Sequence, residues 1–457
     1  MHIQTRNPAT EKVIASYPLF TMEQIDHLII SAHDAFQVWR RTDFSLRRQL
    51  MLKLAKLLRQ RQDEFARLIT CEMGKPITAG KAEIEKCAWV CEHYAENAAS
   101  YLTPKVIKTE YKKNIISYQP LGVVFAIMPW NFPFWQVFRF AAPTIMAGNA
   151  GILKHAPIST GTGNAIAEVF LEAGFPLHLF QHFILNNDQA AGVIAHDKIV
   201  AVTLTGSENA GSIVAANAAS HLKKAVLELG GNDPYLVLAD ADLSLAANCI
   251  VTSRLNNCGQ VCIAAKRVIV VKEIAVELTD KVNHLVKQYK MGDPLDPATI
   301  LGPMAREDLR SQLHQQIQVS LAKGATLLVG GEIPRQRGYY YPPTILLNVS
   351  PGMPAFDEEL FGPVISIIIA EDEAHAIQLA NQSRYGLGGA VFTRDLARGE
   401  RIATQEIEVG SCFVNSLVTS DPRLPFGGIK RSGFGRELAQ EGILEFMNIK
   451  TVSISEE

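Results

Sequence analysis

A cysteine beside a glycine turn is the residue of this sequence best suited to nucleophilic chemistry. Residues 257–262 read Asn-Cys-Gly-Gln-Val-Cys and follow a predicted helix, so the last of them, Cys262, can be held exposed and partly ionised. A buried, inert cysteine is the alternative that this segment alone leaves open. We interpret Cys258 as a neighbour of the nucleophile. A disulfide between the two cysteines, formed under oxidant, is a further hypothesis.

Two polar residues elsewhere in the chain could assist such a nucleophile. Asn131 lies between two prolines in residues 129–133, Pro-Trp-Asn-Phe-Pro, which follow an apolar run. Rigid prolines would fix its amide where a polarised carbonyl oxygen could accept a hydrogen bond. Glu228 ends an apolar segment at a glycine turn, in residues 228–232, Glu-Leu-Gly-Gly-Asn. Taken alone, such a glutamate is more commonly a helix-end or loop carboxylate.

Glycine-rich segments give only partial nucleotide-binding signals. Residues 206–211, Gly-Ser-Glu-Asn-Ala-Gly, have the glycine spacing of a P-loop but lack the following Lys-Ser/Thr, which excludes a kinase or ATPase reading. What remains is a predicted strand over residues 200–204, followed by Gly206 and Ser207 at the start of a predicted helix. Free N–H groups and the positive end of a helix suit a pyrophosphate. A simple N-cap at Ser207 is the alternative.

The bulk properties are those of an ordinary globular chain. Of 457 residues, 47% are hydrophobic and 20% are charged, and the formal net charge at pH 7 is −2. This length predicts two or three domains, and the charge gives no reason to expect a nucleic acid or an anionic membrane as partner. The polar N-terminus lacks a signal core, and prolines break the longest apolar run, so we expect a cytoplasmic protein.

The cysteines predict neither a disulfide framework nor a metal site. They are seven in number and irregularly spaced. Cys87 and Cys91 share a predicted helix without a second cysteine or histidine pair nearby, so we interpret them as small buried residues. We therefore expect no catalytic metal.

The pattern of apolar residues predicts an α/β fold. Residues 21–101 have helical spacing, and after residue 115 short apolar runs alternate with helical stretches such as residues 162–173. Strands that alternate with helices predict a parallel sheet covered on both faces. The predicted strands are residues 122–128, 150–153, 199–204, 235–238, 265–271, 365–369 and 389–392, with an edge strand at 451–455.

These segments occur in the order and approximate spacing of the aldehyde dehydrogenase superfamily, which the chain resembles over essentially its whole length. The resemblance begins at residues 7–10, Asn-Pro-Ala-Thr, and includes residues 359–363, Glu-Leu-Phe-Gly-Pro, and 425–433, Pro-Phe-Gly-Gly-Ile-Lys-Arg-Ser-Gly. Within the superfamily the sequence is most similar to bacterial succinate-semialdehyde dehydrogenases. The resemblance implies three parts: a Rossmann-type dinucleotide-binding domain (1–101 and 121–229), an α/β catalytic domain (230–430) and a small β oligomerisation extension (102–120 and 431–457). The extension would build a homodimer or homotetramer.

The resemblance also implies roles for individual residues. Cys262 would attack an aldehyde to give a thiohemiacetal and then a thioester. The Asn131 amide and the Cys262 N–H would hold the oxyanion, and Glu228 would activate water for hydrolysis. The implied cofactor contacts are Met128, Trp130, Lys154, Gly206, Ser207, Glu359 and Phe361.

Two departures from the family pattern leave the coenzyme and the substrate open. Pro157 stands where many NAD-preferring relatives carry a glutamate that repels a 2′-phosphate, so NAD and NADP both remain possible as cofactor. Arg139 matches an arginine that binds the far carboxylate of semialdehydes, a surface salt bridge being its alternative. Asn256 stands where some relatives carry a second arginine, and Arg254 or Arg423 could supply that charge.

Succinate semialdehyde is therefore the expected small-molecule substrate, and uncharged aldehydes are the alternative. A CoA-acylating enzyme would not need Glu228, and a non-catalytic binding or structural member would have lost Cys262 or Glu228. A cysteine hydrolase is disfavoured because no cysteine-protease signature surrounds Cys262.

Overall fold

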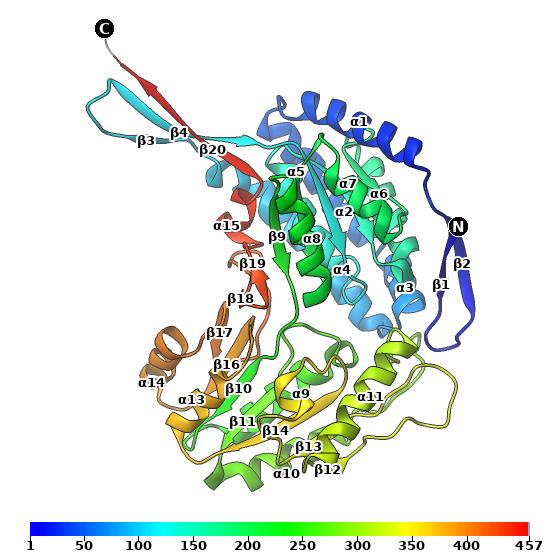
Figure 1. The fold of residues 1–457 in the computed structure, drawn as a ribbon, viewed down its shortest axis with the longest axis vertical. Helices are drawn as coiled ribbons and strands as arrows, with labels where there is room; N and C mark the ends of the chain where they lie inside the picture. The colour runs from blue at the N-terminus through cyan, green and yellow to red at the C-terminus, as the bar shows by residue number, and fades with distance from the viewer. Residues whose placement is uncertain (456–457) are drawn as a thin grey trace.

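The computed structural model describes residues 1–455, so the last two residues of the predicted extension lie outside the described residues. Two large sheets form the centres of two bodies, which Figure 1 shows one above the other. The upper sheet is parallel except for one edge strand, as the alternation of strands and helices predicted. Its spatial order is β19 (Gly433–Phe434), β9 (Lys224–Glu228), β8 (Ile199–Thr205), β5 (Val123–Met128), β6 (Ala150–His155) and β7 (Phe180–His182).

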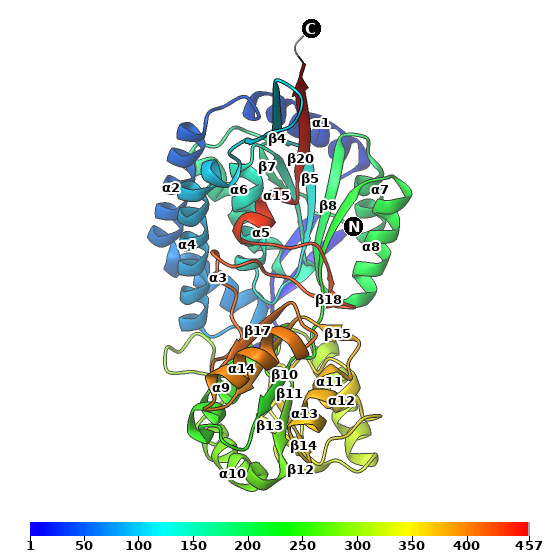
Figure 2. The same cartoon turned by 90° about the vertical axis from the view of Figure 1, so that its left-hand side faces the viewer.

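Helices cover both faces of this sheet. Figure 2 shows α2 and α4 on one side and α7 and α8 on the other. Polar caps set several of the helix starts: Thr21 and Gln24 form a capping box at α1, and Asn186 and Gln189 form one at α7. The helical elements of this body are α1 (Met22–Trp39), α2 (Phe44–Gln60), α3 (Gln62–Met73), α4 (Ile77–Tyr101), α5 (Trp135–Met146), η1 (Pro157–Ser159), α6 (Thr160–Ala173), α7 (Asn187–Ala195), α8 (Glu208–Ser220) and α15 (Ala439–Leu444).

The lower body is built around a second, mainly parallel sheet. Its spatial order is β12 (Thr326–Val329), β13 (Thr344–Leu347), β14 (Val364–Ala370), β11 (Arg267–Val271), β10 (Pro234–Val237), β16 (Gly388–Phe392) and β17 (Ser411–Val414). Only β12 runs antiparallel to its neighbour. The helical elements here are α9 (Leu243–Leu255), η2 (Asn256–Gly259), η3 (Lys272–Ile274), α10 (Ala275–Val286), α11 (Glu307–Ala322), α12 (Pro354–Asp357), α13 (Glu373–Asn381), α14 (Leu396–Arg401) and η4 (Ile402–Glu406).

Each body has an apolar core of its own. The first core draws chiefly on residues 25–229 and 438–447, and the second on residues 235–418. Cys87 and Cys91 are fully buried in the first core, as their helical spacing suggested. Two short ribbons complete the fold: β1 (His2–Arg6) pairs with β2 (Val13–Pro18), and β15 (Tyr385–Gly386) pairs with β18 (Ile429–Lys430).

A three-stranded antiparallel sheet projects away from both bodies (Figure 1). It consists of β20 (Met447–Ile454), β4 (Lys113–Pro120) and β3 (Lys105–Ile107), with β20 and β3 at its two edges. The projecting part is shorter than the sequence suggested, because β19 joins the upper sheet and α15 packs in the first core. Among residues 1–455, no helix is long and apolar enough to cross a membrane.

A buried ion pair supports the helix that follows the Asn131 loop. Lys75 and Glu83 form this pair, and the side chain of each is 1% exposed. Glu83 Oε1 accepts hydrogen bonds from the N–H groups of Phe134 and Trp135, each at 2.9 Å, where α5 begins. Lys75 Nζ lies 3.6 Å from the ring centroid of Phe132. A negative charge at a helix start is favourable, and here it also fixes the direction of α5.

Removing one partner of this pair should destabilise the protein strongly. Lys75→Met leaves the Glu83 carboxylate buried without its cation, so we expect the free energy of unfolding to fall by about 3–5 kcal/mol in denaturant titrations. Lys81→Met is the matched control, because the ion pair of Lys81 with Asp63 is exposed and should contribute about 1 kcal/mol or less. Equal losses in the two variants would contradict this assignment.

Candidate active site

The candidate site lies where the strand order of the upper sheet reverses. Along the chain, β5 is followed by β6 and β7 on one side and then by β8 on its other side. Open α/β sheets bind ligands at the carboxyl ends of the strands at such a switch point. A cleft of about 1360 Å³ opens here and reaches the lower body. The predicted residues in its lining are Trp130, Asn131, Gly206, Ser207, Cys262, Glu359 and Phe361.

A tight loop after α9 brings Cys262 to the cleft. Asn257, Cys258 and Gly259 have φ angles of 49°, 55° and 72°, all in the left-handed region. A Cβ at position 259 would lie only 2.1 Å from the carbonyl oxygen of Gly362. Glycine is therefore required at position 259, where the loop passes the backbone of Gly362 shortly before it reaches Cys262.

Arg254 supports this loop from within the lower body. It is fully buried, and its guanidinium donates to the carbonyl oxygens of Val364, of Gly259 at 3.2 Å and of Leu360 at 2.6 Å. These contacts with backbone carbonyl oxygens use the guanidinium N–H groups that a substrate carboxylate would need. The expectation that Arg254 binds substrate is therefore corrected: its role is to hold the loop.

Arg423 is likewise placed away from the cleft. Its side chain is 68% exposed, pairs with Asp421 at 2.6 Å and lies 5.5 Å from the ring centroid of Trp89. It does not belong to the lining of the cleft. Asn256, the position of the second arginine in some relatives, lies at the start of η2. Of the predicted substrate arginines, Arg139 is the one whose positive charge acts on Cys262.

The Asn131 side chain joins the upper body to the Cys262 loop. Asn131 Nδ2 donates to the carbonyl oxygen of Gln260 at 3.1 Å, and Asn257 Nδ2 donates to the Asn131 carbonyl oxygen at 2.7 Å. Because an amide nitrogen carries two hydrogens, Asn131 keeps one donor for another acceptor. Asn131 and Cys262 both line the cleft. If a carbonyl carbon were bonded to Cys262, its polarised oxygen could accept a hydrogen bond from this remaining N–H.

His155 holds the other side of the Asn131 loop. The N–H of Ala156 donates to His155 Nδ1 at 2.8 Å, so the ring proton is on Nε2, which contacts the Pro133 carbonyl oxygen at 2.8 Å. Burial lowers the pKa of His155 to about 4, so the ring is neutral near pH 7. The loop is thus fixed from the β6 side as well.

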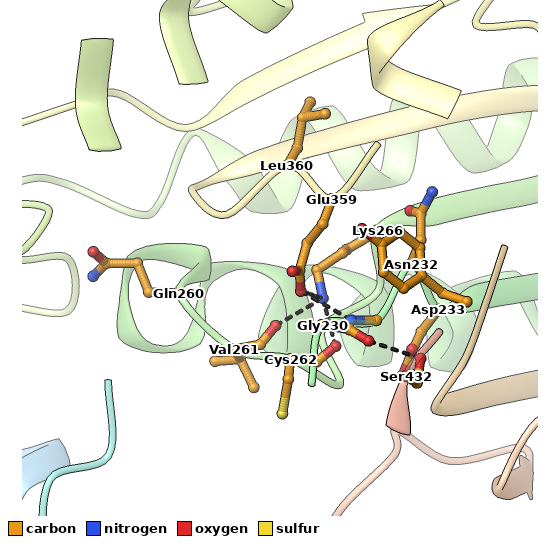
Figure 3. Close-up of polar contacts among 12 residues, drawn as sticks. Gly230, Asn232, Asp233, Gln260, Val261, Cys262, Lys266, Glu359, Leu360 and Ser432 are labelled. Carbon is orange, nitrogen blue, oxygen red and sulfur yellow. Dashed lines mark hydrogen bonds and ion pairs between the residues drawn. The ribbon is translucent and has the colours of Figure 1, made fainter. Parts of the chain in front are cut away.

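Lys266 connects the Cys262 loop to a carboxylate of the cleft, as Figure 3 shows. Its buried ammonium donates to the carbonyl oxygens of Val261, at 3.0 Å, and Cys262, at 2.5 Å. It also pairs with Glu359 Oε1 at 3.0 Å. Glu359 Oε1 in turn accepts from the N–H of Gly231 at 3.0 Å. The carboxylate is therefore held in place at the wall of the cleft.

The charges around Cys262 partly offset its burial. Burial raises the pKa of the Cys262 thiol to about 11, whereas the positive charges of Arg139 and Lys266 lower it. Cys258 is fully buried, and burial raises its pKa to about 12. This supports our interpretation of Cys258 as a neighbour, and the disulfide hypothesis stays a prediction.

Glu228 and Arg139 belong to a buried group of charges outside the cleft lining. Arg139 forms an ion pair with Glu437 and lies 4.5 Å from the ring centroid of Phe426. Its salt bridge is thus buried instead of exposed at the surface. Glu228 is 2% exposed, and its two oxygens have no hydrogen-bond partner within residues 1–455. Burial, and then the Glu437 carboxylate, raise the pKa of Glu228 well above its usual range.

The start of α8 offers an anion site in the cleft. Ser207 caps the helix, its Oγ accepting from the Ala210 N–H at 3.3 Å, so the N-cap interpretation also applies. The first-turn N–H groups have no partner within the helix and suit a phosphate. Glu208 in this turn would repel an anion, but it is paired with Arg431 and, at 3.5 Å, with Arg384.

The opposite end of the cleft fits a flat ring on a sugar. Trp130 and Phe361 meet edge to face with ring centroids 5.8 Å apart. A Cβ at Gly230 would lie 2.2 Å from Glu359 Oε2, so only glycine leaves room for this carboxylate. A carboxylate fixed in this way can accept hydrogen bonds from ribose hydroxyls. Together with the α8 anion site, the cleft fits a dinucleotide.

Three other predicted cofactor residues lie at neighbouring strand ends. Met128 ends β5, Lys154 is close to the end of β6, and Pro157 opens η1. Burial lowers the pKa of Lys154. None of the three belongs to the lining around Cys262, and they continue the same sheet edge on the β6 side. They are placed to meet the far end of an extended ligand.

Sequence reasoning missed three residues of the site: Lys266, His155 and Glu437. The short spacing between Cys262 and Lys266 is a signal that could have indicated a contact. Glu437 gave no such signal, because its partner Arg139 lies in a distant part of the chain.

Comparisons with known proteins show the family of the chain. Residues 1–452 match the model of the aldehyde dehydrogenase family. The chain is 46% identical to the succinate semialdehyde dehydrogenase [NAD(P)+] Sad of Escherichia coli (strain K12), covering 99% of this chain and 97% of that one. It is also 46% identical, over 100% of both chains, to a probable NADP-dependent succinate-semialdehyde dehydrogenase of Synechocystis. The structure of a succinic semialdehyde dehydrogenase from Streptococcus pyogenes with NADP+ superposes with a TM-score of 0.97, at 36% identity and 99% and 100% coverage.

The raised pKa of Cys262 predicts how its reactivity depends on pH. The thiolate is the reactive form, so without coenzyme the rate of alkylation by iodoacetamide should rise about tenfold per unit between pH 7 and 9. Lys266→Met removes a positive charge and should lower this rate. Cys412, whose pKa burial raises to about 12, provides the internal control when labelled peptides are quantified by mass spectrometry. A rate independent of pH would show that Cys262 is already ionised.

Proposed function

The chain belongs to the aldehyde dehydrogenase family, and we propose that it oxidises succinate semialdehyde to succinate with NAD or NADP through a thioester on Cys262. One observation carries this proposal: Cys262 and the amide of Asn131 share the wall of a cleft that fits a dinucleotide. A nucleophile, an oxyanion donor and a coenzyme site in one cleft are what the oxidation of an aldehyde requires.

The first step we propose is attack of the Cys262 thiolate on the aldehyde carbon. The bond gives a thiohemiacetal whose oxygen carries the developing negative charge. The remaining N–H of the Asn131 amide and the backbone N–H of Cys262 would hold that oxygen, each donor contributing about 3 kcal/mol. Because Asn131 is bonded to the Cys262 loop, the donor and nucleophile keep a fixed relation.

The coenzyme would be held along the upper wall of the cleft. Ser207 and the first turn of α8 would receive the pyrophosphate, and Glu359 would accept from the ribose next to the nicotinamide. Lys154 would bind the adenosine ribose, with Met128 and Pro157 beside it. When bound, the coenzyme accepts the hydride that leaves the thiohemiacetal carbon. Trp130 and Phe361 would pack beside the flat ring and keep water away from it.

Glu228 would activate the water that hydrolyses the thioester. Its raised pKa gives it the basicity that this step needs. The carboxylate is buried beside Gly427, where a Cβ would lie 2.7 Å from Glu228 Oε1. We therefore propose that the side chain turns from this position toward Cys262 after the thioester has formed.

The names of the relatives support the substrate and leave both coenzymes possible. Sad of Escherichia coli is named for NAD(P)+, and the Synechocystis relative for NADP+. Pro157 carries no charge that would repel a 2′-phosphate. Arg139 stays in the proposal as a positive charge near Cys262, although its guanidinium is paired with Glu437.

We propose that the enzyme is a homodimer or homotetramer in the cytoplasm. The edges of the projecting sheet, β20 and β3, support pairing of subunits, because an open strand edge offers unpaired backbone groups. All seven cysteines are free, which suits a reducing compartment.

Cys262→Ala should abolish the oxidation of aldehydes and leave the affinity for NAD and NADP nearly unchanged. The substitution removes the nucleophile but none of the proposed coenzyme contacts. The formation of reduced coenzyme is followed by its absorbance, and coenzyme binding by calorimetry. Cys258→Ser is the matched control and should retain much of the activity. Substantial turnover by Cys262→Ala would overturn the proposed nucleophile.

Glu228→Gln should produce a burst of reduced coenzyme on mixing and then stall. The amide cannot take a proton from water, so the thioester forms but is not hydrolysed. Stopped-flow absorbance measures the burst, which should approach one equivalent per active site. If no burst is seen, Glu228 acts before hydride transfer or serves only the fold.

A further inference from the structure

One ammonium group holds the backbone on both sides of Cys262. Lys266 Nζ donates to the carbonyl oxygen of Val261 at 3.0 Å and to that of Cys262 at 2.5 Å. These oxygens belong to the two peptide groups that flank the Cα atom of Cys262. Because each peptide group is planar, holding both of them restrains the backbone torsions of Cys262 and the direction in which its side chain leaves the backbone.

The Val261 carbonyl group and the Cys262 N–H belong to the same peptide group. This peptide group is trans, so its N–H points away from the side on which the Val261 oxygen meets Lys266. The N–H of Ala264 also donates to the Val261 oxygen, at 3.2 Å, so two donors hold that oxygen. Within residues 1–455 the Cys262 N–H has no hydrogen-bond acceptor of its own. It is therefore a free donor whose direction is set by the contacts of the carbonyl group behind it.

Lys266 is itself fixed by its surroundings. Its side chain is 1% exposed, and its ammonium also pairs with Glu359 Oε1 at 3.0 Å, as Figure 3 shows. The three N–H groups of the ammonium thus have three acceptors, of which two are the carbonyl oxygens beside Cys262. Gly231 leaves room for the Cys262 oxygen, because a Cβ at position 231 would lie 2.7 Å from it. These hydrogen bonds are charge-assisted and therefore strong.

We propose that Lys266 is a positioning residue, which aims the Cys262 N–H at the aldehyde oxygen while the Cys262 sulfur attacks the aldehyde carbon. This inference rests on the proposed thiohemiacetal and names the residue that orients one of its two oxyanion donors, the other being the amide of Asn131. As the C–S bond forms, the π electron pair of the C=O bond moves to the oxygen. A positive charge at the Val261 oxygen polarises the peptide group, so its N–H becomes a stronger donor to that oxygen.

The test compares two reactions of the same thiolate. Addition to an aldehyde places a negative charge on an oxygen, whereas alkylation by iodoacetamide releases iodide and builds no oxyanion. At saturating coenzyme, Lys266→Met should lower kcat/KM for succinate semialdehyde about 10- to 100-fold more than it lowers the rate of alkylation of Cys262. Loss of the positive charge makes the thiolate scarcer and lowers both rates by a common factor, which the comparison removes. Butanal should show the same excess loss.

Two further variants complete the experiment. Lys272→Met makes the same substitution in the same body, where the ion pair with Glu371 is exposed, and should change neither rate. Lys266→Gln is a second neutral variant, for which the same excess loss is expected. Its polar side chain suits the buried polar surroundings if Lys266→Met does not fold. Circular dichroism shows which variants are folded.

The possible outcomes separate this inference from the proposed function. An equal loss in the two reactions would mean that Lys266 acts only through its charge or only supports the fold, so the inference is overturned and the proposed function stands. The same holds if neither rate changes. If wild type does not oxidise the aldehyde, or if Cys262→Ala still does, the proposed function is wrong and the inference fails with it.

Discussion

Two side-chain amides join the two bodies of the molecule at the site, and the chemistry depends on the alignment that they set. Asn131 lies on a loop of the upper body, and Cys262 lies on a loop of the lower body that also packs against the first core. Asn131 donates to the Gln260 carbonyl oxygen at 3.1 Å, and Asn257 donates to the Asn131 carbonyl oxygen at 2.7 Å. Rotation of one body against the other would break both bonds, so the relation between the proposed oxyanion donor and the proposed nucleophile is fixed before substrate arrives.

The buried charged side chains around this junction make different contacts. Lys266 holds Glu359 and two carbonyl oxygens of the nucleophile loop, which links the proposed ribose contact to the nucleophile. Arg139 pairs with Glu437, and its positive charge partly offsets the burial that raises the pKa of Glu228.

Much of the fold could be predicted from the sequence, because its parallel strands are apolar runs bounded by glycine, proline or asparagine. The predicted strand at 122–128 is Val123–Met128, and that at 365–369 is Val364–Ala370. The site residues carried by local segments, Asn131 and Cys262, were also predicted and line one cleft. The direction of long cationic side chains could not be predicted. Arg254 turns inward to backbone carbonyls, whereas Arg423 lies at the surface beside Asp421.

The buried position of Glu228 follows from what its charge would do to Cys262. A carboxylate beside the thiol would raise the pKa of that thiol further, when burial already raises it to about 11. In its observed position Glu228 is desolvated and lies near Glu437, and both raise its own pKa. Cys262 then experiences the positive charges of Arg139 and Lys266, which favour the thiolate. If Glu228 activates water as proposed, the base and the nucleophile must act at different times, and a side chain that turns only after the thioester has formed satisfies both demands.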